Sequence, residues 1–177
     1  MSEIKFIMDN ICTDETRDYK CYNTILDLIT KNVEFRKTIF NGIVDGKISG
    51  FSQNLWDKIS SQNIRAPGVN NFCEVFKDGY NQGYCTVCSK QVSYSFNNCY
   101  LCGGNLPILI GTTNCPNGDH SWIEKDNYII DTTLMLIIDK TYADNLGYIL
   151  DNKYNPNEND NYLASKEYAN DQSFKRQ

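Results

Sequence analysis

A β-hairpin predicted over residues 121–131 most strongly constrains how this chain can fold. Residues 121–124 and 128–131 are short segments that contain aromatic and β-branched residues, and the polar residues 125–127 separate them. This pattern is typical of two antiparallel strands joined by a tight turn. Residues 134–138 read Leu-Met-Leu-Ile-Ile, which predicts a further, buried strand. The middle of the chain therefore predicts an antiparallel sheet.

The first third of the chain predicts three helices, because its apolar residues recur at helical spacing. The first helix is expected to begin at Thr13, whose side chain can cap it. The second is expected to end near Gly46 and the third before Pro67. The positions predicted to face the core are Tyr22, Ile25, Leu26, Ile29, Val33, Ile39, Phe40, Ile43, Val44, Leu55, Trp56 and Ile59.

The later part of the chain adds a predicted strand at residues 106–110 and a short helix at 139–146 that ends at Gly147. We therefore predict an α+β fold in which a helical N-terminal part packs with an antiparallel sheet. Residues 1–150 are expected to form a single domain. Residues 151–177 form a polar segment that could be a tail or a surface helix.

Composition narrows the function classes. The chain has 177 residues, 41% hydrophobic and 22% charged, which fits one globular domain rather than a disordered chain or a coiled coil. Seventeen basic against 22 acidic residues give a net charge of −5, which argues against a nucleic-acid partner. No apolar run is long enough to span a bilayer, and no secretory signal is visible, so we expect a soluble, cytoplasmic protein without a membrane partner.

Eight cysteines and a single histidine limit the chemistry further. In a protein without a secretory signal, cysteines are more often reduced, metal-bound or catalytic than paired in disulfides. The lone His120 excludes any site that needs two imidazoles. Cys12, Cys21 and Cys115 are expected to be packing or surface thiols.

The predicted hairpin brings His120 close to Asp131. A two-residue turn at positions 125–126 makes the two residues direct cross-strand partners, and a turn at 126–127 makes them diagonal neighbours on the same face. Only an odd loop length would separate them. A carboxylate next to an imidazole is the second half of a nucleophilic triad, because it fixes the ring tautomer and stabilises the imidazolium.

The nucleophile of such a triad is expected to be a cysteine at a helix N-terminus, where the positive end of the helix favours a thiolate. Cys85 fits this expectation, because Gly83 ends a loop before it and apolar residues or cysteines follow at helical spacing. Those residues are Cys88, Val92 and Phe96.

Three short motifs together resemble the transglutaminase-like cysteine enzymes of the papain-type fold. They are Gly-x-Cys at residues 83–85, His-x-Trp-x-Glu at 120–124 and Ile-Asp-Thr-Thr at 130–133, and the resemblance covers roughly residues 82–134. It implies a papain-like core in which Cys85 is the nucleophile, His120 the general base and Asp131 the orienting acid.

In this resemblance Trp122 and Glu124 match the aromatic and acidic positions that commonly follow the histidine. Gln82 and Trp122 are the candidates for oxyanion or substrate binding, together with Asn81 and the backbone N–H of Cys85. The implied activity is thiol-dependent acyl transfer on a protein amide or peptide bond, without a cofactor. The enzyme would be a protease, a deamidase or a transglutaminase. The chain departs from the family pattern in three ways: the interval from cysteine to histidine is compact, Cys88 replaces the usual small residue, and no oxyanion donor is obvious.

A zinc site is the alternative hypothesis. Two Cys-x-x-Cys pairs, Cys85 with Cys88 and Cys99 with Cys102, have the arrangement of a Cys₄ site in an interaction module. A zinc-bound Cys85 cannot act as a nucleophile. Cys73 would then be the remaining catalytic thiol, or the protein would not be an enzyme. The downstream hairpin favours catalysis, because a zinc ribbon does not need it. The sequence leaves the oligomeric state open.

Overall fold

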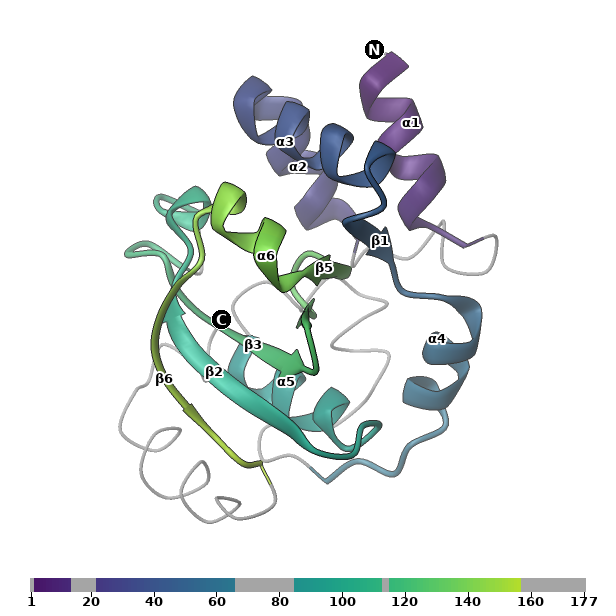
Figure 1. The fold of residues 1–177 in the computed structure, drawn as a ribbon, viewed down its shortest axis with the longest axis vertical. Coiled ribbons are helices and arrows are strands. Elements are labelled where there is room, and N and C mark those ends of the chain that lie inside the picture. The colour runs from purple at the N-terminus through teal and green to yellow at the C-terminus, as the bar shows by residue number, and fades with distance from the viewer. Residues whose placement is uncertain (1, 14–21, 66–84, 113–114, 157–177) are drawn as a thin grey trace.

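Six antiparallel strands form one sheet in the order β1-β5-β4-β3-β2-β6 (Figure 1). The structure is a computed structural model and describes residues 2–13, 22–65, 85–112 and 115–156. Together with the helices, this sheet confirms the predicted α+β class. The strands are β1 Ile48–Gly50, β2 Cys99–Asn105, β3 Asp119–Lys125, β4 Tyr128–Asp131, β5 Leu136–Asp139 and β6 Ile149–Tyr154.

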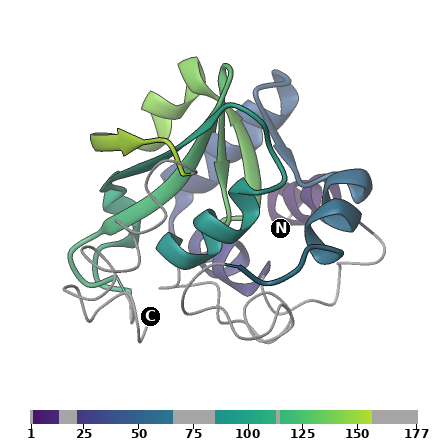
Figure 2. The same ribbon diagram turned by 90° about the horizontal axis from the view of Figure 1, so that it is seen from below.

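Helices pack around both faces of this sheet. In Figure 1, α1, α2 and α3 gather at one end of the molecule, and Figure 2 shows α5 against the sheet. The helices are α1 Ser2–Ile11, α2 Asn23–Lys31, α3 Val33–Val44, α4 Gln53–Ser60, α5 Cys85–Ser93 and α6 Lys140–Ala143. Among the described residues, no helix combines the length and apolar character needed to cross a bilayer.

β3 and β4 form the predicted hairpin, and their register selects between the two predicted pairings. Lys125 pairs with Tyr128, so the turn consists of residues 126–127. Because side chains alternate between the faces of a sheet, this register makes Asp131 a diagonal neighbour of His120 on the same face. The hairpin prediction is confirmed, with the second of the two turns.

The N-terminal helices differ in part from the prediction. Helix α1 was not predicted, and α2 begins at Asn23 rather than at Thr13. Val33 and Val44 were predicted to be core residues but are 49% and 60% exposed. They are the first and last residues of α3, where a helix turns away from the surface that it covers. Leu26 is also exposed.

Residues 106–110 do not form the predicted strand. Pro107–Leu109 is a 3₁₀ helix, η3, with Leu109 buried beneath it. Proline lacks the N–H that a central strand needs, so an apolar run that contains it favours another conformation. The predicted helix at 139–146 is confirmed as α6 followed by the 3₁₀ helix η4, Asp144–Leu146, and Gly147 ends it with φ 93°.

The sheet continues beyond the predicted end of the domain. Strand β6 pairs with β2 along residues 149–154, so the boundary predicted at residue 150 falls inside a strand. Residues 151–154 therefore belong to the sheet and form neither a tail nor a surface helix. Residues 157–177 lie outside the described part of the chain.

Candidate active site

Helix α5, which carries Cys85, is fixed against the sheet. All of its described residues are buried, and Cys85 is the first of them. The Oγ1 of Thr86 lies 2.8 Å from the Oγ of Ser121 on β3, and the Ser89 hydroxyl donates to the Ser121 carbonyl at 3.5 Å. Thr86 follows Cys85 in the chain, and Ser121 follows His120. These hydrogen bonds therefore connect α5 to β3 directly beside the two predicted catalytic residues.

His120 and Asp131 form a buried hydrogen-bonded pair. The Nε2 of His120 lies 2.8 Å from the Oδ2 of Asp131, and both side chains are fully buried. An ionised carboxylate can only accept, so Nε2 is the protonated nitrogen of the ring. The structure thus confirms that the hairpin brings these two residues together.

The Asp131 carboxylate accepts hydrogen bonds from both backbone and side-chain donors. Its Oδ1 accepts from the backbone N–H groups of Thr133 and Leu134, both at 2.9 Å. Its Oδ2 accepts from His120 and, at 2.5 Å, from the hydroxyl of Tyr148. Burial alone would raise the pKa of Asp131, but the charge of His120 and these hydrogen bonds lower it below its usual value. Asp131 is therefore held in the ionised form.

Cys85 is the second titratable group that acts on the imidazole. Among the described residues, the Nδ1 of His120 has no hydrogen-bond partner. Burial lowers the pKa of His120. The charge and hydrogen bond of Asp131, with a smaller contribution from hydrogen bonding and charge of Cys85, more than offset burial and raise that pKa above 6.5. The imidazole is therefore coupled to a carboxylate at Nε2 and to a nearby thiol, which is the arrangement a triad requires.

Cys115 is a second buried thiol near this site. Burial raises its pKa to about 12, and the charge of Cys85 adds to that increase. Cys115 was predicted to be a packing or surface thiol, and the structure places it in the core, in agreement with the first alternative. Its raised pKa keeps it protonated at neutral pH, so it is a weak nucleophile compared with a thiolate.

The four thiols of the zinc hypothesis do not converge. Cys99 and Cys102 are three residues apart on β2, so their side chains lie on opposite faces of the sheet. The Cys99 thiol donates to the Ser93 carbonyl of α5 at 3.6 Å. Burial raises the pKa of Cys102 to about 12, with a further contribution from the charge of Glu124, which lies on the same face of the sheet as Cys102. Within the described ranges, no group of three or more potential ligands could hold a metal ion.

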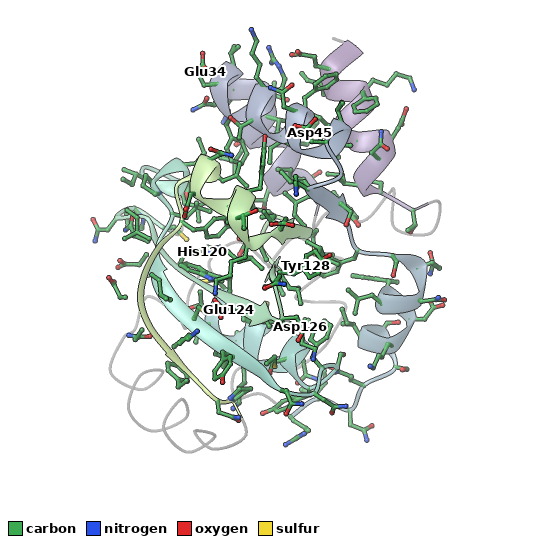
Figure 3. The ribbon with its side chains drawn as sticks, in the orientation of Figure 1. Glu34, Asp45, His120, Glu124, Asp126 and Tyr128 are labelled. Atoms are coloured by element: carbon green, nitrogen blue, oxygen red, sulfur yellow. The ribbon has the colours of Figure 1, made fainter. Side chains whose placement is uncertain are left out.

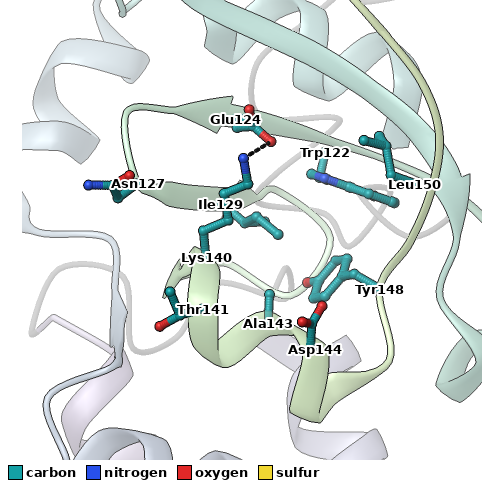
Figure 4. A pocket seen from close by; sticks show the side chains of 10 residues that line it. All are labelled: Trp122, Glu124, Asn127, Ile129, Lys140, Thr141, Ala143, Asp144, Tyr148 and Leu150. Carbon is teal, nitrogen blue, oxygen red and sulfur yellow. Dashed lines mark ion pairs between the residues drawn. The ribbon is translucent and has the colours of Figure 1, made fainter.

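A second charged cluster lies on the same face of the sheet as His120. Figure 3 shows His120 and Glu124 on β3. The Glu124 carboxylate is paired with Lys140 at 3.2 Å and with Lys153 at 2.9 Å. It borders a pocket of about 350 Å³ between the sheet and α6 (Figure 4). Trp122 and Tyr148 also line this pocket.

Trp122 lies between this pocket and the histidine. Its ring centroid lies 5.9 Å from that of His120 and 4.9 Å, edge-on, from that of Tyr148. The side chain is buried, so it supports the imidazole and forms part of the pocket wall. The other sequence candidates lie outside the described residues; these are Gln82, Asn81, Gly83 and the alternative thiol Cys73.

Sequence reasoning did not find Tyr148 or the two backbone donors to Asp131. The backbone donors had a signal, because an aspartate directly before two threonines at a strand end is typical of a turn in which the carboxylate accepts from the following N–H groups. Tyr148 had no such signal. It lies 17 residues from Asp131, and its position depends on the path of α6 and η4.

Comparison with models of known protein families, with characterised proteins and with solved structures finds no match.

Proposed function

We propose that this protein is a thiol-dependent acyl-transfer enzyme that uses Cys85, His120 and Asp131. The observation that carries the proposal is the buried hydrogen bond between His120 and Asp131, which occupies Nε2 and leaves Nδ1 without a partner among the described residues, while Cys85 also acts on the imidazole. A lone structural histidine needs neither an ionised buried carboxylate on one nitrogen nor a thiol near the other. This arrangement fits a nucleophile, a general base and an orienting acid.

The chemistry proceeds in two steps. The Sγ of Cys85, after losing its proton to Nδ1 of His120, attacks a carbonyl carbon of the substrate amide. The C–N bond then breaks, the leaving amine takes the proton from His120, and the acyl group remains on Cys85 as a thioester. An acceptor attacks this thioester, His120 removes the acceptor's proton, and the Cys85 sulfur leaves.

Asp131 supports both steps without reacting. Its negative charge stabilises the imidazolium that forms each time His120 accepts a proton, and its hydrogen bond keeps the ring in one tautomer. With water as acceptor the enzyme is a protease or a deamidase, and with an amine it is a transglutaminase. The substrate class is a protein or peptide amide, as in the transglutaminase-like enzymes that residues 82–134 resemble. The same resemblance supports a papain-like core.

The thiol chemistry can be tested without a known substrate. The protein would be treated with iodoacetamide near about pH 6.5, and labelling at each cysteine would be followed by mass spectrometry. We expect Cys85 to react at least about tenfold faster than Cys102 or Cys115, because His120 is available to take the Cys85 proton, whereas burial raises the pKa of the other two thiols to about 12. Replacement His120→Gln should remove most of this advantage. Equal or slower labelling of Cys85 would contradict the proposal.

Acyl transfer is then tested on a mixed protein substrate such as casein. Three products are measured: new N-termini, released ammonia, and incorporation of a fluorescent primary amine. We expect at least one product to form, to disappear in Cys85→Ala, and to persist in the matched control Cys115→Ala. Formation of none of the three, or full activity in Cys85→Ala, would overturn the assignment.

A further inference from the structure

The hydroxyl of Tyr148 reaches the Asp131 carboxylate. It donates at 2.5 Å to Oδ2, the same oxygen that accepts from His120. We infer that Tyr148 is a positioning residue of the triad, which holds Oδ2 of Asp131 toward Nε2 of His120. This inference rests on the proposed function.

The backbone donors alone do not fix the oxygen that meets His120. The N–H groups of Thr133 and Leu134 both bind Oδ1. Rotation about the bond that carries the carboxylate would keep a contact to Oδ1 while it moves Oδ2 out of line with the imidazole. A second donor on Oδ2 opposes this rotation. Tyr148 supplies that donor from a different element of the fold.

Tyr148 is suited to this role because its proton stays in place. Burial raises the pKa of its hydroxyl well above 10, and the charge of Asp131 raises it further. The phenol therefore keeps its proton and donates to the ionised Asp131 at neutral pH. A hydrogen bond from a neutral phenol stabilises the carboxylate without introducing a competing positive charge.

The ring of Tyr148 is itself held in place. Gly147 ends η4 with φ 93°, a conformation that favours glycine, and so sets the direction in which the chain leaves the helix. The ring then packs edge-on against Trp122. Figure 4 shows Tyr148 beside the pocket on the α6 side. The hydroxyl thus meets the triad while the ring forms part of a packed wall.

The test removes one oxygen atom. Tyr148→Phe keeps the ring and its packing and deletes the donor. Tyr142→Phe is the matched control, because the Tyr142 hydroxyl also donates a hydrogen bond, in this case to the partly buried Thr38 carbonyl of α3 at 2.7 Å. Thermal unfolding of both variants measures the purely structural cost.

Two readouts separate positioning from structure. The first is a steady-state measurement of kcat and KM for the reaction detected with casein. Tyr148→Phe should lower kcat by about tenfold or more and leave KM nearly unchanged. The second is the NMR titration of His120, whose signals are unambiguous because it is the single histidine of the chain. Misalignment of Oδ2 should lower the pKa of His120 by about 0.5 or more. Tyr142→Phe should change neither.

The titratable groups that act on His120 are Cys85 of α5, Asp131 of β4 and, through Asp131, Tyr148. In an Asp131→Asn background, Tyr148→Phe should therefore have no further effect on the His120 titration. The inference fails if Tyr148→Phe leaves the pKa of His120 unchanged. It also fails if the variant raises that pKa, because the hydroxyl would then compete with the imidazole for Oδ2 of Asp131 rather than position it. The titration needs no substrate, so failure of the acyl-transfer assay alone would count against the proposed function and not against this hydrogen bond.

Discussion

Two carboxylates on one face of the sheet are stabilised in different ways. Asp131 on β4 is fully buried and accepts from two backbone N–H groups, a phenol and an imidazole. Glu124 on β3 is paired with Lys140 and Lys153 at the edge of the pocket. Both carboxylates have a lowered pKa, but only Asp131 has a partner whose charge can change near neutral pH.

This difference separates a chemical role from a structural one. The positive charge beside Asp131 depends on a proton that His120 can gain or lose, so the pair can take part in proton transfer. Glu124 is instead paired with lysines, a residue type that does not change charge near neutral pH, and their side chains are 48% and 40% exposed. The Glu124 cluster therefore joins α6, β3 and β6, whereas the Asp131 cluster serves His120.

Asp131→Asn should have the largest effect. The asparagine keeps the size of the side chain and an oxygen for the backbone donors, but it can no longer stabilise an imidazolium. We expect kcat to fall by about 10²–10⁴-fold, in line with the contribution of general acid–base catalysis. Steady-state kinetics on the product identified with casein would measure this loss.

A circular-dichroism spectrum like that of the wild type would show that Asp131→Asn still folds. If the folded variant retained more than about a third of the wild-type kcat, Asp131 would have no role in catalysis. The comparison with Glu124 would then lose its basis, because both carboxylates would be structural.

Glu124→Gln should have a smaller effect than Asp131→Asn, and the effect should be on stability rather than on catalysis. The two lysines can be hydrated after the charge is lost, because they are partly exposed, so screening keeps the cost low. We expect the free energy of unfolding to fall by about 1 kcal/mol, or roughly 2–4 °C in Tm. The kcat should stay within about threefold of the wild type. Urea unfolding and kinetics on the same sample would check both, and a kcat loss as large as that of Asp131→Asn would remove the distinction.

The hairpin that supplies His120 and Asp131 could be predicted from the sequence because its information is local. Two short apolar segments and a polar turn specify antiparallel strands, and any two-residue turn leaves the two side chains on the same face. The helix that carries Cys85 was predictable for the same reason, since its pattern is contained within a few turns.

The remaining features depend on contacts between distant parts of the chain. The pairing of β6 with β2 gives a strand role to polar residues that have no apolar alternation. The opposite orientations of Cys99 and Cys102 follow from a strand conformation that the Cys-x-x-Cys spacing does not reveal. Tyr148 reaches Asp131 only because η4 and Gly147 direct the chain back to the sheet.

The central claim is that Cys85, His120 and Asp131 act as one charge-coupled unit, and the NMR titration of His120 tests it most directly. The charges and hydrogen bonds of Asp131 and Cys85 raise the pKa of His120, so the wild-type imidazolium should persist above pH 6.5 and lose its proton only at higher pH. Cys85→Ala removes one of these contributions and should lower the pKa by about 0.5 or more, whereas Cys115→Ala should leave it unchanged. A wild-type His120 that titrates near 6.5, with no response to Cys85→Ala, would contradict the account.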